Sequence, residues 1–308
     1  MSLLRWFIKS SVQSNTTSMA GVVIRRLAGR SDLKRVAKLV QQEGWDLSLS
    51  TLIKFNDIGL SDWWVAESSD GRVIGSCNMV NHEDNRTCHA GMFIVDEKYR
   101  SQGIGGKLKS AVLAGVQEKN VLITALKPEH VLEPFKPLHE IHNLQLTKTN
   151  QKLPSLPRTE FRILPLADVP LELVEKYDGR THPIKRTTLF HRCIIGDATC
   201  VFVAVESSSG NVIGYAALKE TRKLWEFCPT YADTDDVGYE LIRKMLDHVP
   251  EGGNIEVTPF AENQTAIDLY KEIGFSIQFT CMLMYSQKPP TIPVRKVYSA
   301  AGNDYSPM

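Results

Sequence analysis

The sequence lacks the features that would place this chain in a membrane or on a nucleic acid. No apolar run approaches the roughly 18 residues that a membrane-spanning helix needs. The 36 lysines and arginines are balanced by 35 acidic residues, which leaves a formal net charge of +1. A strong basic excess is the usual electrostatic mark of a nucleic-acid-binding protein, and none is present. We therefore expect neither a nucleic acid nor a membrane among the partners of this protein.

Cysteine pairs with metal-ligand spacing are also missing. None of the six cysteines forms C-x-x-C, and no histidine stands at zinc-finger spacing. Several cysteines lie inside apolar runs such as TCVFVAV and FTCMLMY. Such positions are typical of buried free thiols in a reducing compartment. We expect no bound metal.

Acidic residues are absent from the beginning of the chain, where the first is Asp32. Residues 1–20 carry Arg5 and Lys9 among serines and threonines. This composition is compatible with a mitochondrial transit peptide and equally with a disordered leader. We expect a cytoplasmic protein, with a mitochondrial location as the alternative.

A short internal repeat divides the chain. Residues 67–76 read ESSDGRVIGS and residues 206–215 read ESSSGNVIGY, with seven of ten positions identical. Each copy lies between two strand-like runs and carries a glycine that permits a hairpin turn. A length of 308 residues also favours two domains over one. We interpret the repeat as a tandem duplication of one α/β unit.

The apolar periodicity of the first copy predicts the element order β-α-α-β-β-β-α-β. The second copy begins near Phe161, after the polar stretch TKTNQKLPSLPR, and repeats the hairpin, a further strand and a helix. We expect an α/β fold of the α+β type with mixed sheets. The expected division is a leader at 1–20, a first domain at 21–147, a linker at 148–159, a second domain at 160–287 and a tail at 288–308.

A glycine-rich stretch at residues 95–108, VDEKYRSQGIGGKL, follows an apolar strand and opens a helix. It is not a Walker A loop, because Ser101 stands at the first glycine position and Leu108 replaces the hydroxyl residue. It is not a dinucleotide loop either, because Leu108 stands where the third glycine belongs. The pattern that remains is R/Q-x-x-G-x-G/A, matched by Arg100, Gly103 and Gly105.

Physical chemistry favours an anion at this loop. Glycines lack a Cβ, so the backbone can approach a ligand closely. The free N–H groups and the dipole at a helix start favour phosphate. Four cations, Lys98, Arg100, Lys107 and Lys109, lie in or shortly after the loop, and no acid lies between Glu97 and Glu118. The alternative is a tight turn that only joins a strand to a helix.

The stretch resembles the pyrophosphate loop of the GNAT superfamily of acyl-CoA N-acyltransferases. That resemblance implies acetyl-CoA as co-substrate, gripped by the end of the strand and by the loop. The residues that it assigns to cofactor binding are Phe93, Ile94, Val95, Arg100, Ser101, Gln102, Gly103, Ile104, Gly105, Gly106 and Lys107.

The second copy has lost this loop. At the corresponding place it reads YADTDDVG over 231–238, with three carboxylates that would repel a pyrophosphate. Its CPTYAD stretch resembles the C-terminal lobe of tandem GNAT proteins, where G-P-x-Y-A-D is usual. An Asp with an Arg eight residues later is frequent in that subgroup, and Asp178 and Arg186 fit this spacing. We expect Asp178 to pair with a cationic substrate. Arg186 would orient Asp178 or bind a carboxylate. The alternative is a pair that only pins helices.

The resemblance implies direct transfer of an acetyl group from acetyl-CoA to a primary amine, in a ternary complex. The acceptor class is a small-molecule or peptide amine. Since such amines are protonated near neutral pH, a base is needed, and Glu83 and His89 are the candidates. Their simpler interpretations are a solvated turn and a strand histidine. Many family members return a proton to the CoA thiolate from a tyrosine in N-x-x-A-x-x-L-Y. That pattern occurs only in the second copy, where we expect Tyr270 to pack in the core. Its absence from the first copy favours the alternative function, a non-enzymatic acyl-CoA-binding sensor.

Overall fold

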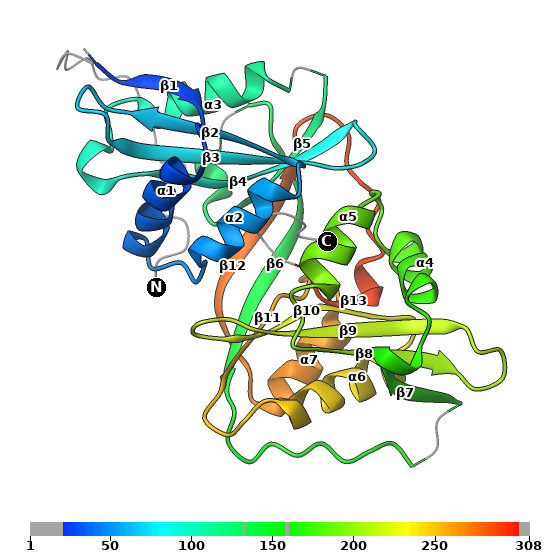
Figure 1. Ribbon diagram of the computed structural model, residues 1–308. Coiled ribbons are helices and arrows are strands. Elements are labelled where there is room, and N and C mark those ends of the chain that lie inside the picture. The colour runs from blue at the N-terminus through cyan, green and yellow to red at the C-terminus, as the bar shows by residue number, and fades with distance from the viewer. Residues whose placement is uncertain (1–20, 117, 132, 158–159, 302–308) are drawn as a thin grey trace. The chain divides into compact units, whose positions relative to one another are not determined.

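The computed structural model describes residues 21–116, 118–131, 133–157 and 160–301 (Figure 1). The chain forms two compact units. Unit 1 comprises Met1–Pro137 and Met284–Lys288, and unit 2 comprises Leu138–Leu283 and Pro289–Met308. Within the described ranges, no helix is long and apolar enough to cross a membrane.

Unit 1 has the predicted order of elements. These are β1 (Val23–Arg26), α1 (Arg30–Gln42), α2 (Leu49–Asp57), β2 (Ser61–Glu67), β3 (Val73–Asn81), β4 (Thr87–Val95), the 3₁₀ turn η1 (Glu97–Tyr99), α3 (Ile104–Ala114), β5 (Asn120–Ala125) and the 3₁₀ turn η2 (Pro128–His130). Strands β1 to β4 are antiparallel neighbours, and β5 runs parallel to β4. Helices α1 and α2 lie on one side of this sheet and α3 on the other (Figure 1).

Helix α1 buries the stripe that its sequence predicts. Leu33, Val36, Ala37 and Val40 recur at helical spacing, and all four are buried. Strand β3 is buried along nearly its whole length, as expected for a central strand with helices on both faces.

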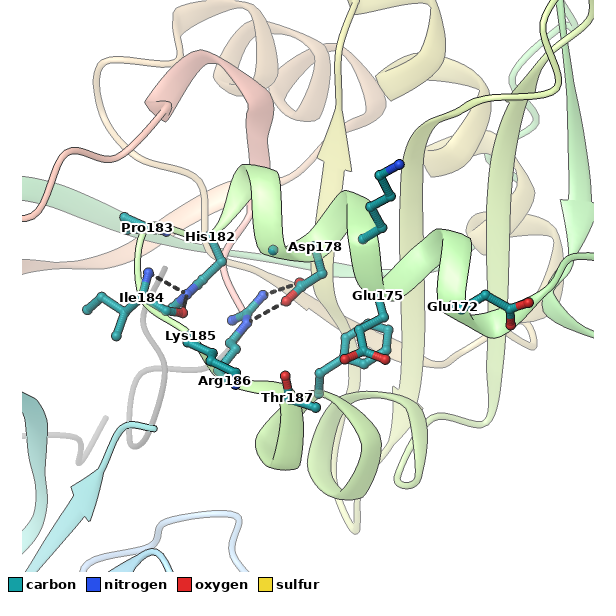
Figure 2. A pocket seen from close by; sticks show the side chains of 12 residues that line it. Glu172, Glu175, Asp178, His182, Pro183, Ile184, Lys185, Arg186 and Thr187 are labelled. Carbon is teal, nitrogen blue, oxygen red and sulfur yellow. Dashed lines mark hydrogen bonds and ion pairs between the residues drawn. The ribbon is translucent and has the colours of Figure 1, made fainter. Parts of the chain in front are cut away.

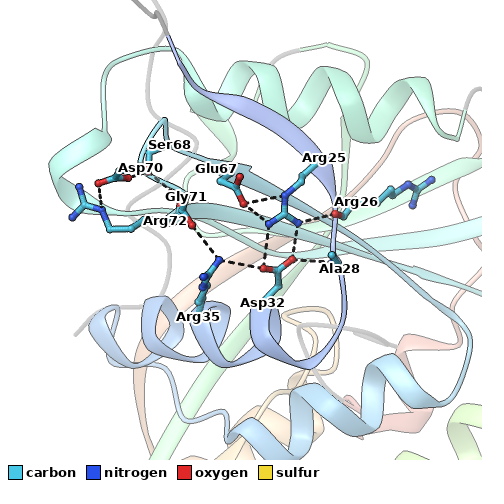
Figure 3. A network of polar contacts seen from close by, with 10 residues as sticks. All are labelled: Arg25, Arg26, Ala28, Asp32, Arg35, Glu67, Ser68, Asp70, Gly71 and Arg72. Atoms are coloured by element: carbon cyan, nitrogen blue, oxygen red, sulfur yellow. Dashed lines mark hydrogen bonds and ion pairs between the residues drawn. The ribbon is translucent and has the colours of Figure 1, made fainter.

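Arg25 of β1 joins α1 to β2 through two carboxylates (Figure 3). Its guanidinium donates to Asp32 at 2.6 Å and to Glu67 at 3.1 Å. Asp32 also accepts the backbone N–H of Ala28 at 2.8 Å, which ties the first turn of α1 to the residue before its N-cap, Gly29. The hydrogen bond from Arg25 lowers the pKa of Asp32, although burial opposes it. The network fixes how the first helix leaves the sheet.

Unit 2 repeats the arrangement with additions at both ends. Its elements are β6 (Lys136–Thr147), β7 (Phe161–Pro165), the 3₁₀ turn η3 (Leu166–Asp168), α4 (Leu171–Thr181), α5 (Thr187–Leu189) running into the π-helix η4 (Phe190–Ile195), β8 (Cys200–Glu206), β9 (Val212–Glu220), β10 (Trp225–Ala232), α6 (Asp235–His248), β11 (Asn254–Val257), α7 (Gln264–Ile273), β12 (Ser276–Tyr285), the 3₁₀ turn η5 (Val294–Lys296) and β13 (Val297–Ser299). The strand order is β12-β6-β11-β10-β9-β8-β7, and β13 pairs with β10. Helices α4 and α5 cover one face and α6 and α7 the other (Figure 1).

The core of unit 2 contains Tyr270, as the sequence predicts. Tyr270 is fully buried and meets the ring of Phe275 edge-on, at 5.1 Å between centroids. Leu144 and Leu146 of β6 and Tyr298 of β13 belong to the same apolar cluster.

The expected domain division differs from the structure in three places. Strand β6 pairs with β11, Leu144 opposite Val257 and Thr147 opposite Asn254, so residues 138–147 belong to unit 2 and not to the first domain. The expected tail at 288–308 contains the buried strand β13. Met284–Lys288 belongs to unit 1, where the N–H of Ser286 donates to the carbonyl of Val121 on β5 at 3.0 Å. The expected leader, residues 1–20, lies outside the described residues.

Candidate acyl-CoA site

The glycine-rich stretch connects β4 to α3 in unit 1. Asp96 ends the strand: its N–H donates to Ile74 of β3 at 2.8 Å, and its carboxylate accepts the N–H of Lys98 at 3.0 Å. This cap starts the turn η1, which delivers the chain to Arg100. The turn therefore follows from an aspartate at the strand end, where its side chain competes for backbone donors.

Strand β4 carries one extra residue relative to β3. Ser76 faces Ile94 and Asn78 faces Gly91, so three steps along β4 match two along β3. Met92 within this bulge has φ 50°, and its carbonyl accepts the hydroxyl of Ser76 at 3.1 Å. A bulge bends its strand and increases the local twist.

Beyond the bulge, β4 separates from β5. The parallel pairing covers Thr87 to Ala90 of β4 and stops there, although both strands continue. In a strand, every second residue directs its N–H and C=O to the same neighbouring strand. Because the N–H of Asp96 bonds to β3, the backbone groups of Ile94 point to β3 as well. The N–H groups of Phe93 and Val95 therefore point to the side where β5 has left. These are residues that the sequence assigned to the cofactor.

The loop after Arg100 turns through two left-handed residues, Ser101 with φ 61° and Gly103 with φ 76°. Helix α3 starts at Ile104, and its first internal bond runs from the N–H of Lys107 to the carbonyl of Gly103, at 3.1 Å. The N–H groups of Ile104, Gly105 and Gly106 precede that bond and have no acceptor among the described residues. Open space extends 4 Å around the position of a Cβ on Gly106. Such a helix start is a ready anion site.

Arg100 braces this loop from behind. Its Nε donates to the carbonyl of Val95 at 2.9 Å, and its other end forms a close ion pair with Glu43 at the end of α1. Burial raises the pKa of Glu43, and Arg100 opposes this shift. The guanidinium thus ties strand, loop and helix together. Sequence reasoning missed Glu43, which lies 57 residues before Arg100 and belongs to no motif.

The neighbouring lysines differ in how they are held. Lys98 is exposed and Lys107 is half-buried beside the open amides. Lys109 donates to the carbonyl of Glu133 at 3.2 Å and stands 6.0 Å from the ring centroid of Phe135, and burial lowers its pKa. Of these three, Lys98 and Lys107 are the cations next to the loop.

Two ranges of the sequence match family profiles with the same description, acetyltransferase (GNAT) domain. They cover residues 59–135 and residues 174–299, together more than half of the chain. The chain belongs to the GNAT acetyltransferases. No curated protein matches the sequence.

Solved structures show the same fold at low sequence identity. A Pyrococcus horikoshii protein assigned as an acetyltransferase is 16% identical, with a TM-score of 0.74, over 96% of this chain and all of that one. A tandem GNAT protein of the clavulanic acid biosynthesis pathway is 16% identical, with a TM-score of 0.64, over 88% of this chain and 99% of that one. A GCN5-related N-acetyltransferase of Sphaerobacter thermophilus is 16% identical, with a TM-score of 0.61, over 88% and 97%.

The two base candidates of the GNAT interpretation lie away from the loop. His89 is fully buried in β4, opposite Val80 of β3 and Leu122 of β5. Glu83 lies in the turn before β4, at the opposite end of that strand from the loop, and is half-buried. Asp84 closes this turn by accepting the backbone N–H groups of Arg86 and Thr87, both at 2.9 Å. The structure brings neither candidate to the loop.

In unit 2, Asp178 and Arg186 meet as their spacing predicts, in a buried bidentate pair (Figure 2). The two bonds measure 3.0 Å and 2.6 Å. Tyr215 donates to Asp178 at 2.6 Å, and Arg186 donates to the hydroxyl of Tyr231 at 3.0 Å. Burial lowers the pKa of Arg186, and the charge of Asp178 outweighs it, so the net shift is upward.

The pair lines a cavity of about 460 Å³ on the α4–α5 side of unit 2, together with Glu172, Lys176 and Lys185. Both members of the pair are engaged with each other and with tyrosines, an arrangement that pins α4 to α5. Among the residues described, no cluster of three or more His, Cys, Asp or Glu side chains is arranged to hold a metal ion.

Proposed function

We propose that unit 1 transfers an acetyl group from acetyl-CoA to a primary amine, by direct transfer in a ternary complex. The observation that carries this proposal is the start of α3. Three consecutive N–H groups that have no acceptor among the described residues follow a left-handed glycine, in the connection that leaves a strand separated from its neighbour. Phosphate oxygens suit the first feature, and an extended pantetheine chain suits the second.

Each part of the site has its own role in this proposal. The amides of Ile104, Gly105 and Gly106 hold the pyrophosphate, with Lys107 adding charge. Arg100 acts as a positioning residue, because its guanidinium is bound to Glu43 and Val95. The N–H groups of Phe93 and Val95 bind along the pantetheine and polarise the thioester carbonyl. Acetyl-CoA supplies the activated acyl group.

The attacking amine has to lose a proton, because its usual pKa lies near 10. Glu83 is the better candidate for the base, since it is partly accessible whereas His89 is fully buried. A base acts within hydrogen-bond reach of the proton or through one water. Glu83 can therefore serve only an amine substrate that extends to the β3–β4 turn.

A second candidate function is an acyl-CoA-binding sensor without turnover. The observation that favours it is the segment after β5. In the described residues between Ala125 and Lys136, unit 1 has the short turn η2 and no counterpart of the tyrosine-bearing helix α7 of unit 2. A unit without that tyrosine has to return the proton to the CoA thiolate in another way.

One experiment separates the two functions. Acetyl-CoA binding is measured by calorimetry, and thiol release is then followed with a panel of amino acids, polyamines, aminosugars and peptides. The transferase proposal predicts saturable release with at least one class of amine. Binding without release across the panel supports the sensor, and absence of binding contradicts both functions.

A further inference from the structure

Both units have the same junction between a strand and a helix, which allows a residue-by-residue comparison. Asp96 donates to Ile74 in unit 1, and Asp233 donates to Ile213 in unit 2, at 2.8 Å and 2.9 Å. The residue after each acceptor is a glycine that faces the helix. A Cβ placed on Gly75 would lie 3.1 Å from Leu108, and a Cβ placed on Gly214 would lie 3.2 Å from Leu241. Leu241 therefore corresponds to Leu108.

Counting back from these leucines, Gly238 corresponds to Gly105. The connection from the aspartate to the leucine has twelve steps in unit 1 and eight in unit 2, so the second is four residues shorter. Before this connection, β4 and β10 each separate from the parallel strand that follows in sequence. Pairing of β4 with β5 ends at Ala90, and pairing of β10 with β11 ends at Glu226 opposite Glu256.

In unit 2 another strand fills the place of the missing neighbour. Strand β13, from the end of the chain, pairs with β10 through Thr230 opposite Ser299 and Tyr231 opposite Val297 (Figure 1). The corresponding residues in unit 1 are Phe93 and Ile94, in the segment of β4 whose Phe93 and Val95 amides are proposed to bind the pantetheine of acetyl-CoA. Strand β13 thus pairs with the edge of β10 that corresponds to the β4 edge proposed to bind the cofactor in unit 1.

The other side of β13 is bonded to the chain that follows β11. Thr258 donates its N–H to the hydroxyl of Ser299 at 2.9 Å and accepts the N–H of Ala300 at 3.0 Å. The side chain of Asn263 donates to the carbonyl of Val297 at 3.0 Å. The segment is therefore held on both edges, between the two strands that have separated.

Tyr298 occupies the helix start. A Cβ placed on Gly238 would lie 2.5 Å from the Tyr298 ring, so only a glycine leaves room for it. The hydroxyl of Tyr298 donates to Asp235, and Lys296 donates to Asp233 at 3.0 Å. Asp233 and Asp235, two of the three acids at this junction, are thus bound by this segment.

We propose that the groove between β10 and β11 is a binding site for an extended peptide, and that its occupant is residues 294–301 of the same chain. A strand supplies backbone donors and acceptors to an open edge, and pockets for alternate side chains give specificity. Here the pocket over Gly238 takes an aromatic ring, and the acids at 233 and 235 take a cation and a hydroxyl. The proposal concerns unit 2 and is independent of catalysis by unit 1.

The test begins with a specific protease site inserted between Lys288 and Pro289 of the full chain, where both side chains are exposed. The folded protein is cleaved, and the fragment that starts at Pro289 is followed by gel filtration and mass spectrometry. We expect the fragment to stay bound. In a Tyr298→Ala variant, which empties the pocket over Gly238, it should dissociate at least tenfold faster.

The matched control is Arg295→Ala, because Arg295 is exposed and contributes only its carbonyl to Asn263. This fragment should dissociate at the rate of the parent. Immediate loss of the parent fragment, or equal rates for the two variants, would overturn the proposal. Acetyl-CoA titration of the nicked Tyr298→Ala protein should still give one site per chain. An increase to two acetyl-CoA sites per chain would show that the groove binds the cofactor, and would also overturn the assignment to a peptide.

Discussion

The β4–α3 junction of unit 1 and the β10–α6 junction of unit 2 have the same strand-to-helix arrangement but differ in the length and charge of the connection and in what pairs with the open strand edge. In unit 1 the connection is long, with left-handed Ser101 and Gly103, and the first amides of α3 have no acceptor among the described residues. In unit 2 the connection is four residues shorter and acidic, and β13 pairs with the open strand edge. Buried backbone groups need partners, so a unit that loses its cofactor loop has to cover the edge in another way.

The comparison also covers charge. Unit 1 keeps cations beside open amides, whereas in unit 2 Asp178 is paired with Arg186 and Asp233 with Lys296. In the unit without the cationic loop, these two carboxylates therefore have partners within the unit. The following variants test this difference, in order of expected effect.

The largest effect is expected in the buried pair of unit 2. Asp178→Asn leaves Arg186 buried without its counter-charge, which typically costs about 3–5 kcal/mol of stability. Denaturant unfolding should show this loss. The acetyl-CoA affinity and the amine KM, measured without denaturant where the variant is folded, should stay unchanged. The control Glu172→Gln, an exposed residue at the same cavity, should shift stability by less than about 0.5 kcal/mol. A raised amine KM at unchanged stability would instead make Asp178 a substrate contact.

The next effect concerns the loop of unit 1. Gly103→Val places a β-branched residue at φ 76° and adds a Cβ where the backbone has to approach the pyrophosphate. Calorimetry should show acetyl-CoA affinity reduced about tenfold or more, which is about 1.4 kcal/mol. Gly71→Val is a matched control, because Gly71 has the same φ of 76° in the β2–β3 turn. It should lower stability similarly and leave the affinity intact, and equal affinities in the two variants would remove the basis for the loop.

A smaller effect separates two roles for Arg100. As a brace, it depends on Glu43, so Arg100→Ala and Glu43→Gln should both weaken acetyl-CoA binding, by about fivefold or about 1 kcal/mol. If the guanidinium bound phosphate itself, Glu43→Gln would release it and leave binding equal or tighter. Parallel titrations of the two variants distinguish these outcomes.

The smallest effect is expected in the half-exposed network at Arg25. Asp32→Asn removes the charge from these hydrogen bonds and should cost about 0.5–1 kcal/mol at neutral pH. Because the pKa of Asp32 is lowered in the folded state, its contribution is full above the unfolded value, near 4, and is lost as the pH falls through the folded value. Unfolding curves of parent and variant should therefore converge in acid. Asp57→Asn, in an exposed ion pair with Arg30, should change stability by less than about 0.3 kcal/mol. A constant difference down to low pH would exclude the charge of Asp32 as the cause.

Local patterns in the sequence predicted most of unit 1. The stripe from Leu33 to Val40, the repeated hairpin and the glycine spacing each depend on neighbouring residues, and the structure contains all three. Glu43 could not be found in this way, because its contact with Arg100 joins residues 57 apart. The spacing of Asp178 and Arg186 predicted that they belong together, but their burial against Tyr215 and Tyr231 needed the fold.

Pairing between distant strands was the part that the sequence left open. Strand β6 was not predicted from the sequence, because its apolar residues do not alternate regularly. The apolar run of β12 predicts a strand but does not state which sheet the end of that strand joins. Strand β13 has only three residues, and the prolines before it are typical of a tail. Its partners are Thr230 and Thr258, which lie far away in sequence.

The crossing of Met284–Lys288 into unit 1 has a consequence for synthesis on the ribosome. The sheet of unit 1 receives its last strand segment about 150 residues after Pro137 has been made, which at typical elongation rates is on the order of ten seconds. During that interval the edge of β5 at Val121 has no partner from Ser286, and an unpaired edge readily binds other strands. The nascent chain should therefore depend on a chaperone during this period, and a fragment that ends at the linker should aggregate.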